Sequence, residues 1–133
     1  MIAARDALNL KTEIVGVVSA HASAYAESFS SVSPIESPVS TKIADGMACS
    51  VPEESALELI WEVVERIVQV SDTEIAESMR MMYECTHNVS EATGAAAIAA
   101  ALKDSAKNIG RKVAVITSDG IVDRDVFTKV LIG

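Results

Sequence analysis

The sequence predicts an α/β fold: a three-layer partial domain in which about three parallel strands are flanked by helices. Short runs of apolar, β-branched residues alternate along the chain with segments of helical spacing. These runs are apolar at nearly every position, as is typical of parallel strands that are buried on both faces. Three strands are few for a sheet that must be covered on both sides, so the domain is predicted to be incomplete.

The first half of the chain contains one predicted strand and three predicted helices. A helix is expected over residues 2–10, followed by a buried strand over Thr12–Val18. Residues 19–42, approximately, are rich in Ser and Pro and are predicted to form a mobile loop with one short helix around Tyr25–Phe29. Apolar side chains then recur at helical spacing, which predicts an amphipathic helix over Ser55–Arg66.

The middle of the chain is predicted to form a strand followed directly by a helix. Ile67–Val70 is a short apolar run, and the next four residues have the Ser-x-x-Glu form of a capping box, with Ser71 at the N-cap and Glu74 three residues later. The helix that this box opens is expected over Thr73–Thr86. Four of its side chains are expected to face inward: Ile75, Met79, Met82 and Tyr83.

The last part of the chain contains an alanine-rich helix, a strand and a final helix. Residues 90–93 can open the alanine-rich helix, whose small side chains over Ala95–Leu102 indicate tight burial, and Gly110 is expected to stop it. Lys112–Thr117 is the clearest strand in the sequence, because it is apolar and β-branched. Asp123 can cap a last helix that runs to Leu131.

Composition excludes several classes of protein. The 133 residues suffice for one domain, and a net charge of −8 argues against nucleic-acid binding, which needs a basic surface. Apolar runs are too short to cross a bilayer, for which roughly 20 residues are needed.

The cysteines, histidines and glycines form none of the common site motifs. Cys49 and Cys85 fit no metal or redox spacing and are expected to be free thiols, so a cytoplasmic location is predicted. Neither His21 nor His87 has a second His or a Cys at metal-ligand spacing, and the isolated glycines exclude a P-loop.

Five segments occur in an order and spacing that resemble a known family. Together they closely resemble the C-terminal part of the catalytic domain of threonine dehydratases, which are fold-type-II pyridoxal-phosphate enzymes related to serine racemase and the tryptophan synthase β chain. The likeness extends over nearly the whole chain. The segments are Glu13–Val18, Ile43–Ala48, Ile67–Ile75, Val89–Ala96 and Val113–Asp123.

The resemblance implies a parent enzyme that converts threonine or serine to a 2-oxo acid and ammonia with pyridoxal phosphate. The family's cofactor-binding lysine, in a Ser-x-Lys context, and its glycine-rich phosphate loop do not occur in these residues. No catalytic residue is therefore assigned to this chain, which is predicted to be inactive alone and not to retain the cofactor. The expected partners are the remainder of its own catalytic domain, a small amino-acid substrate and further copies in a homo-oligomer, with no nucleic acid and no membrane.

The resemblance also assigns candidate site residues. Ser118 matches the serine beside the cofactor's pyridine nitrogen, although Asp119 follows it where the family has glycine. Glu91 and Gly94 match residues near the cofactor ring, but Glu91 can equally be an acid favoured by a helix N-terminus. Asp45 matches an acidic residue on the substrate side, yet Asp-Gly is also an ordinary turn pair.

Some relatives have a metal site that is not expected in this chain. Acidic ligands of that metal site are replaced by Val18 and Ala24, so no metal is predicted.

Two other functions stay open. The first alternative is a non-catalytic binding or assembly module, or a half-enzyme that docks on a partner chain. The second is a small ligand-binding domain unrelated to pyridoxal phosphate, which a closed sheet with a buried Ser118 would support.

Overall fold

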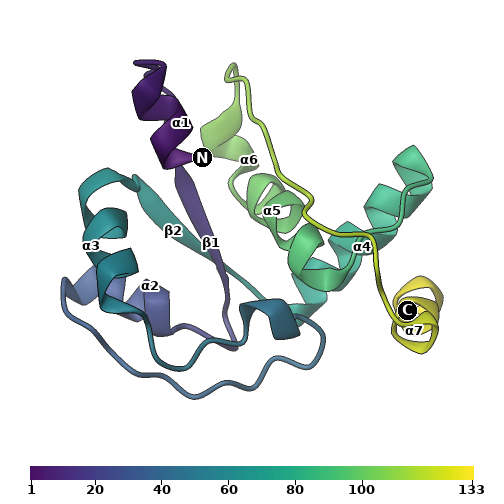
Figure 1. Cartoon of the computed structure of the whole chain (residues 1–133). Helices are drawn as coiled ribbons and strands as arrows, with labels where there is room; N and C mark the ends of the chain where they lie inside the picture. The colour runs from purple at the N-terminus through teal and green to yellow at the C-terminus, as the bar shows by residue number, and fades with distance from the viewer.

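Two parallel strands, β1 and β2, form the centre of the structure (Figure 1). The computed structural model describes residues 1–133. Val17 of β1 lies opposite Val68 of β2 in the parallel register. The strands are β1 (Val15–Ser19) and β2 (Arg66–Val70), and the helices are α1 (Ile2–Ala7), α2 (Ala24–Ser31), α3 (Glu54–Val63), α4 (Asp72–Thr86), α5 (Ala92–Lys103), α6 (Ser105–Asn108), α7 (Arg124–Ile132) and the single 3₁₀ turn η1 (Asp45–Met47).

Helices lie on both sides of this small sheet, as the sequence predicts (Figure 1). Helices α2 and α3 lie on one side, while α5 lies on the other with α4 packed beside it. The arrangement of three layers is therefore confirmed. None of the helices combines the length and the apolar composition needed to cross a lipid bilayer.

The main core lies between the sheet, α4 and α5. Three fully buried side chains, Val70, Ile75 and Met79, meet the alanine-rich face of α5 there. Because alanine has a small side chain, α5 can approach the strands and α4 closely. The tight burial predicted for Ala95–Leu102 is confirmed for one face of α5 only: Ala95, Ala96, Ala99 and Ala100 are buried, whereas Leu102 is 44% exposed. Ala92 and Gly94, at the start of the helix, are also buried.

Helix α4 begins with the capping box that the sequence predicts. Ser71 Oγ accepts a hydrogen bond from the Glu74 backbone N–H at 3.2 Å, and the Glu74 carboxylate accepts one from the Ser71 N–H at 2.7 Å. Of the side chains expected to face inward, Met82 is only half-buried and Tyr83 is exposed. Tyr83 packs edge-on against Phe127 of α7, with ring centroids 5.6 Å apart.

The predicted third strand is wrong: Lys112–Thr117 is not part of the sheet. This segment runs as a single chain past α5 and makes no backbone hydrogen bond to any strand (Figure 1). Its β-branched composition suits a strand, but pairing needs a neighbouring edge, and β1 pairs only with β2. Residues 19–42 contain α2, which is longer than the helix predicted around Tyr25–Phe29.

Candidate functional site

Three segments that are distant in the sequence meet at the N-terminus of α5. They are the turn η1, the residues 89–94 that enter α5, and the turn 118–120 that follows the extended segment. We call this meeting point the α5 junction. It contains or adjoins all five candidate site residues of the sequence analysis: Asp45, Glu91, Gly94, Ser118 and Asp119.

The turn 118–120 lies directly against the start of α5. The Glu91 backbone N–H donates a hydrogen bond to the Asp119 carbonyl at 3.1 Å. A Cβ on Gly94 would lie 3.1 Å from that same carbonyl oxygen, and a Cβ on Gly120 would lie 2.9 Å from the Val89 carbonyl oxygen. Glycine at both positions therefore permits two backbone segments to touch.

Asp119 also shapes this turn with its side chain. Its Oδ1 accepts a hydrogen bond from the Ile121 backbone N–H at 2.8 Å, which is the local contact of an Asx turn. Ser118 precedes it and is exposed. The turn thus holds its conformation with an aspartate, and it leaves the Ser118 hydroxyl accessible to a ligand or another part of the protein.

Glu91 is the N-cap of α5. Its carboxylate accepts hydrogen bonds from the backbone N–H groups of Thr93 at 2.7 Å and Gly94 at 2.5 Å. These are amides that the first turn of a helix leaves without an internal partner. The capping role that the sequence left open for this acid is therefore present in the structure, and both carboxylate oxygens take part in it.

Asp45 lies in the turn η1 and is exposed. Its Oδ1 accepts a hydrogen bond from the Gly46 N–H at 3.0 Å, which agrees with the turn interpretation of the Asp-Gly pair. The loop before it is fixed by Asp72, the first residue of α4. The Asp72 carboxylate accepts from Thr41 Oγ1 and from the Lys42 N–H, both at 2.7 Å, so α4 determines where η1 lies.

Thr93 is a residue of the α5 junction that the sequence analysis does not single out. A Cβ on Gly46 would lie 2.8 Å from Thr93 Oγ1, so η1 sits directly on this side chain. Thr93 Oγ1 is buried and has no hydrogen-bond partner. Nothing in the local sequence indicates this contact, because it joins segments almost 50 residues apart.

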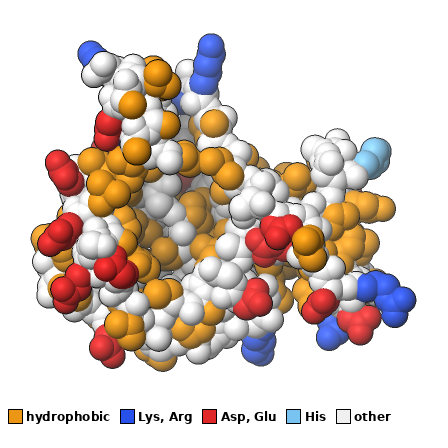
Figure 2. All heavy atoms as spheres, in the orientation of Figure 1, with side chains coloured by type: hydrophobic (Ala, Val, Ile, Leu, Met, Phe, Trp, Pro, Cys, Tyr) orange, Lys and Arg blue, Asp and Glu red, His pale blue; other side chains and the backbone are white.

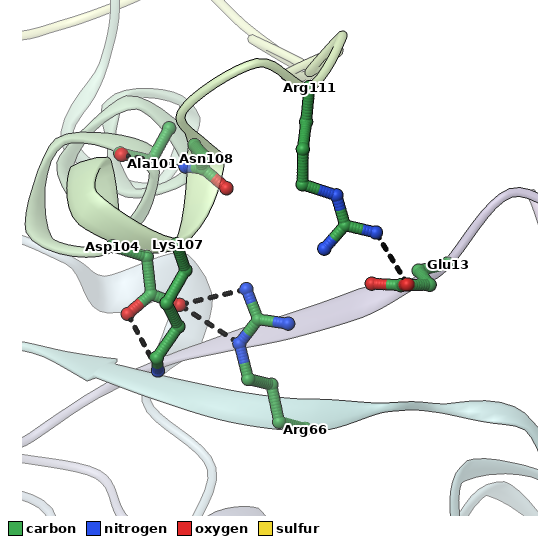
Figure 3. Close-up of polar contacts among 7 residues, drawn as sticks. All are labelled: Glu13, Arg66, Ala101, Asp104, Lys107, Asn108 and Arg111. Atoms are coloured by element: carbon green, nitrogen blue, oxygen red, sulfur yellow. Dashed lines mark hydrogen bonds and ion pairs between the residues drawn. The ribbon is translucent and has the colours of Figure 1, made fainter.

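The ion pairs of the structure lie away from the α5 junction. Figure 3 shows the largest group, in which Asp104 at the end of α5 binds Arg66 at 2.9 Å and Lys107 at 3.1 Å. These cations hold the pKa of the Asp104 carboxyl below its usual range, with Lys107 the larger influence. Nearby, Arg111 lowers the pKa of Glu13 in the same way. No group of three or more His, Cys, Asp or Glu residues comes together to bind a metal ion.

Comparison with known proteins gives consistent matches. The sequence profile of a family described as "Pyridoxal-phosphate dependent enzyme" matches residues 1–119. The chain is 32% identical over 89 residues to an L-threonine ammonia-lyase of Thermotoga maritima, and 30% identical over 123 residues to the catabolic L-threonine dehydratase TdcB of Staphylococcus aureus. It also superposes on maize serine racemase with a TM-score of 0.83 and 28% identity.

The matched regions cover most of this chain and a minor part of each known protein. They span 67% of this chain and 22% of the ammonia-lyase, 90% and 36% for the dehydratase, and 97% and 40% for the racemase. The chain therefore corresponds to about a third of the length of these proteins.

Proposed function

The chain belongs to the family of pyridoxal-phosphate dependent enzymes, and we propose that it is the C-terminal segment of a threonine or serine ammonia-lyase. The observation that supports this most is the α5 junction. There Glu91, Gly94 and Asp119 lie in contact, and Ser118 is exposed beside them. Family membership, the open sheet and the exposed Ser118 all argue against a small ligand-binding domain unrelated to the cofactor.

The residues at the α5 junction fit one side of a cofactor site. Ser118 offers a neutral hydroxyl at the end of an extended apolar segment, where it can bind a ring nitrogen. The spaces beside Gly94 and Gly120 are occupied by this chain's own carbonyl groups, so these glycines form no phosphate cradle. Pyridoxal phosphate, when bound, supplies an electron sink for the substrate's α-carbon.

In this proposal, each residue of the α5 junction has a limited task. Ser118 contacts the cofactor, and Asp119 holds the turn that presents Ser118. Glu91 fixes the start of α5, against which that turn rests. The lysine and the phosphate loop would come from the remainder of the catalytic domain, so the isolated chain is expected to be inactive and without bound cofactor.

A chimera tests this proposal. Residues 1–133 would replace the matching segment of the S. aureus dehydratase, and ammonia release from L-threonine would be measured beside the isolated chain. We expect activity from the chimera and none from the isolated chain. The matched control is a chimera carrying Ser118→Ala, which should keep its melting temperature but lose affinity for pyridoxal phosphate. Turnover by the isolated chain, or a folded chimera without activity, would contradict the proposal.

The alternative is a half-enzyme or assembly module that docks on a separate partner chain. The unpaired edge of β1 favours it, because such an edge can accept a strand from another polypeptide. Reading the genomic DNA upstream of the Met1 codon distinguishes the two. A continuous frame that encodes a Ser-x-Lys motif and a glycine-rich loop supports the segment of a single enzyme, whereas a stop codon supports a separate partner.

A further inference from the structure

The loop that follows α2 carries two Ser-Pro pairs, Ser33–Pro34 and Ser37–Pro38. Both lie between α2 and η1, in a stretch that forms neither helix nor strand. The proline ring keeps the serine before it in an extended conformation, and proline itself lacks a backbone N–H. Protein kinases of the proline-directed class select serine in this context. Each pair is therefore a candidate site for the transfer of a phosphoryl group.

The structure separates the two serines. Ser37 is only 8% exposed, and its Oγ donates a hydrogen bond to the Glu27 carboxylate at 3.1 Å and lies 3.0 Å from Ser23 Oγ. A kinase that enclosed Ser37 would have to break these contacts. Ser33 is exposed, and only its backbone groups make hydrogen bonds within the chain. Of the two pairs, only Ser33–Pro34 therefore presents a free hydroxyl.

Few contacts hold Ser33 in place. Val32 ends α2 in the left-handed conformation, with a φ of 51°, which is unfavourable for a β-branched residue. Two hydrogen bonds to Ser28 hold this turn: the Ser33 N–H donates to the Ser28 carbonyl at 3.3 Å, and the Ile35 N–H donates to Ser28 Oγ at 2.8 Å. A new force on the Ser33 side chain therefore acts on a strained and weakly held segment.

A cavity of about 320 Å³ lies between this segment and α3, and we call it the α3 cavity. Two of the side chains that line it, Glu54 and Glu58, are exposed carboxylates that form no ion pair. No Lys or Arg lines it. Figure 2 shows acidic side chains gathered over the side of the molecule where α3 lies, with no Lys or Arg among them. The cavity is lined by Val32, Ser33, Pro34, Glu54, Glu58 and Trp61.

Trp61 connects the α3 cavity to α2. Its Nε1–H donates a hydrogen bond at 3.1 Å to the Ser28 carbonyl, the same oxygen that accepts from the Ser33 N–H. Displacement of the Ser33 segment therefore disturbs the site that also binds the indole. Because Trp61 is the only tryptophan in the chain, its fluorescence reports on this cavity alone.

We propose that Ser33 is a phosphorylation site for a proline-directed protein kinase, and that the phosphate releases residues 32–34 from α3. The donor is a nucleoside triphosphate. The Ser33 oxygen bonds to the γ-phosphorus, the bond from that phosphorus to the bridging oxygen breaks, the nucleoside diphosphate leaves, and the hydroxyl proton passes to the kinase's carboxylate base.

Charge repulsion is the cause of the release. A phosphoserine carries a charge of about −1.5 to −2 at pH 7. At Ser33 it would lie just beyond the C-terminus of α2, where the helix dipole disfavours an anion, and beside the carboxylates of Glu54 and Glu58. No cation in the α3 cavity offsets this repulsion. The inference does not depend on the proposed enzyme activity.

Phosphorylation in vitro tests the site. The isolated chain, the chimera and a synthetic peptide of residues 29–42 would be treated with a mitogen-activated protein kinase and MgATP, and mass spectrometry would locate the phosphate. We expect both Ser33 and Ser37 to be modified in the peptide, where neither is buried, and only Ser33 in the folded proteins. Ser33→Ala should abolish the modification, and Ser37→Ala should leave it unchanged. Absence of phosphate on Ser33, or equal modification of Ser37 in both proteins, overturns the inference.

The stability of the phosphorylated protein tests the release. Phosphorylation should lower the melting temperature by about 2 °C or more at low salt, and much less in 1 M NaCl, where the Debye length is about 3 Å. Trp61 emission should shift to longer wavelength as the indole meets water, and a phosphatase should reverse both changes. An unchanged melting temperature and emission, or a decrease that salt does not reduce, overturns the release.

Two matched variants connect the effect to the α3 cavity. Glu54→Gln with Glu58→Gln removes both carboxylates of the cavity, whereas Glu62→Gln with Glu77→Gln removes two exposed carboxylates outside it. Phosphorylation should lower the melting temperature of the first variant by less than half as much as that of the second. Equal decreases would overturn the role of the cavity. No readout uses cofactor or amino-acid substrate, so an inactive chimera would reject the proposed enzyme without affecting this result.

Discussion

Close contacts between backbone atoms determine how the segments of the α5 junction fit together. The Val89 carbonyl leaves no room for a side chain at Gly120, and the Asp119 carbonyl leaves little at Gly94. Glu91 then satisfies two amides of the helix that these contacts position. The junction is therefore held by backbone contacts and one cap, and not by a cluster of charges.

Gly120→Ala should be strongly destabilising. The added Cβ would lie 2.9 Å from a backbone oxygen, which cannot move aside as a flexible side chain could. We expect a loss of about 1–3 kcal/mol in the free energy of unfolding, measured by urea denaturation. Ser118→Ala, at the exposed neighbouring position, is the control and should stay within about 0.5 kcal/mol of the wild type. Similar stability of the two variants would contradict the close contact.

Variants of Glu91 separate capping from contact with a cofactor. Glu91→Ser keeps a capping oxygen, so it should cost little stability, whereas Glu91→Ala should cost about 1 kcal/mol. Urea denaturation of both variants measures this difference. In the chimera, normal ammonia release by Glu91→Ser would show that the carboxylate has no role beyond the cap, and strongly reduced release from a stable protein would show that it has one.

At the scale of elements, local sequence determines where helices begin. The capping box at Ser71 and Glu74 was predictable because its two partners are three residues apart and need no distant contact. The predicted strand over Lys112–Thr117 failed for the opposite reason. Strand pairing depends on a neighbour elsewhere in the chain, and the residues of the segment carry no information about whether that neighbour is present.

Ser71→Ala should weaken α4 while its neighbour tolerates the same change. Loss of the N-cap oxygen leaves the Glu74 amide unpaired, at a cost of about 1 kcal/mol in the free energy of unfolding. Thr73→Ala, at an exposed position in the same turn, is the control. Thermal and urea denaturation should both rank Ser71→Ala below the control, and the reverse ranking would contradict the role of the box.

Asp104 should give the end of α5 a pH-dependent stability. Its pKa is lowered in the folded chain by Lys107 and Arg66, so the ion pairs stabilise the fold above the unfolded pKa of about 3.9. This stability is lost as the pH falls through the lower, folded pKa. Asp104→Asn should therefore cost about 1 kcal/mol at pH 7 and progressively less below about pH 4. A cost independent of pH, in urea denaturation at pH 7 and pH 3, would contradict it.

At the scale of the whole molecule, the fold class and the order of the longer helices were predictable, whereas the third strand was not and the assembly of the site was only partly so. The resemblance named Glu91, Gly94 and Ser118, whose segments do meet at the α5 junction. It did not indicate Thr93, or that Asp72 anchors the loop before Asp45, because these contacts depend on how distant elements pack.

The exposed apolar side chains of residues 113–116 should make the isolated chain prone to aggregation on warming. Val115→Lys places a charge in this extended apolar segment and should reduce light scattering on warming. Ile121→Lys is the control, since Ile121 is 85% exposed and lies outside the segment. Equal improvement by both variants would mean that exposed apolar area in general, and not this segment, drives aggregation.

The three segments of the α5 junction are widely separated in the chain, and this separation affects how the junction is made. The turn 118–120 follows η1 by about 70 residues, so at roughly 5–20 residues per second a ribosome adds it several seconds later. During that interval the N-terminus of α5 lacks the turn that rests against it. The order of synthesis therefore makes the α5 junction one of the last parts of this segment to form.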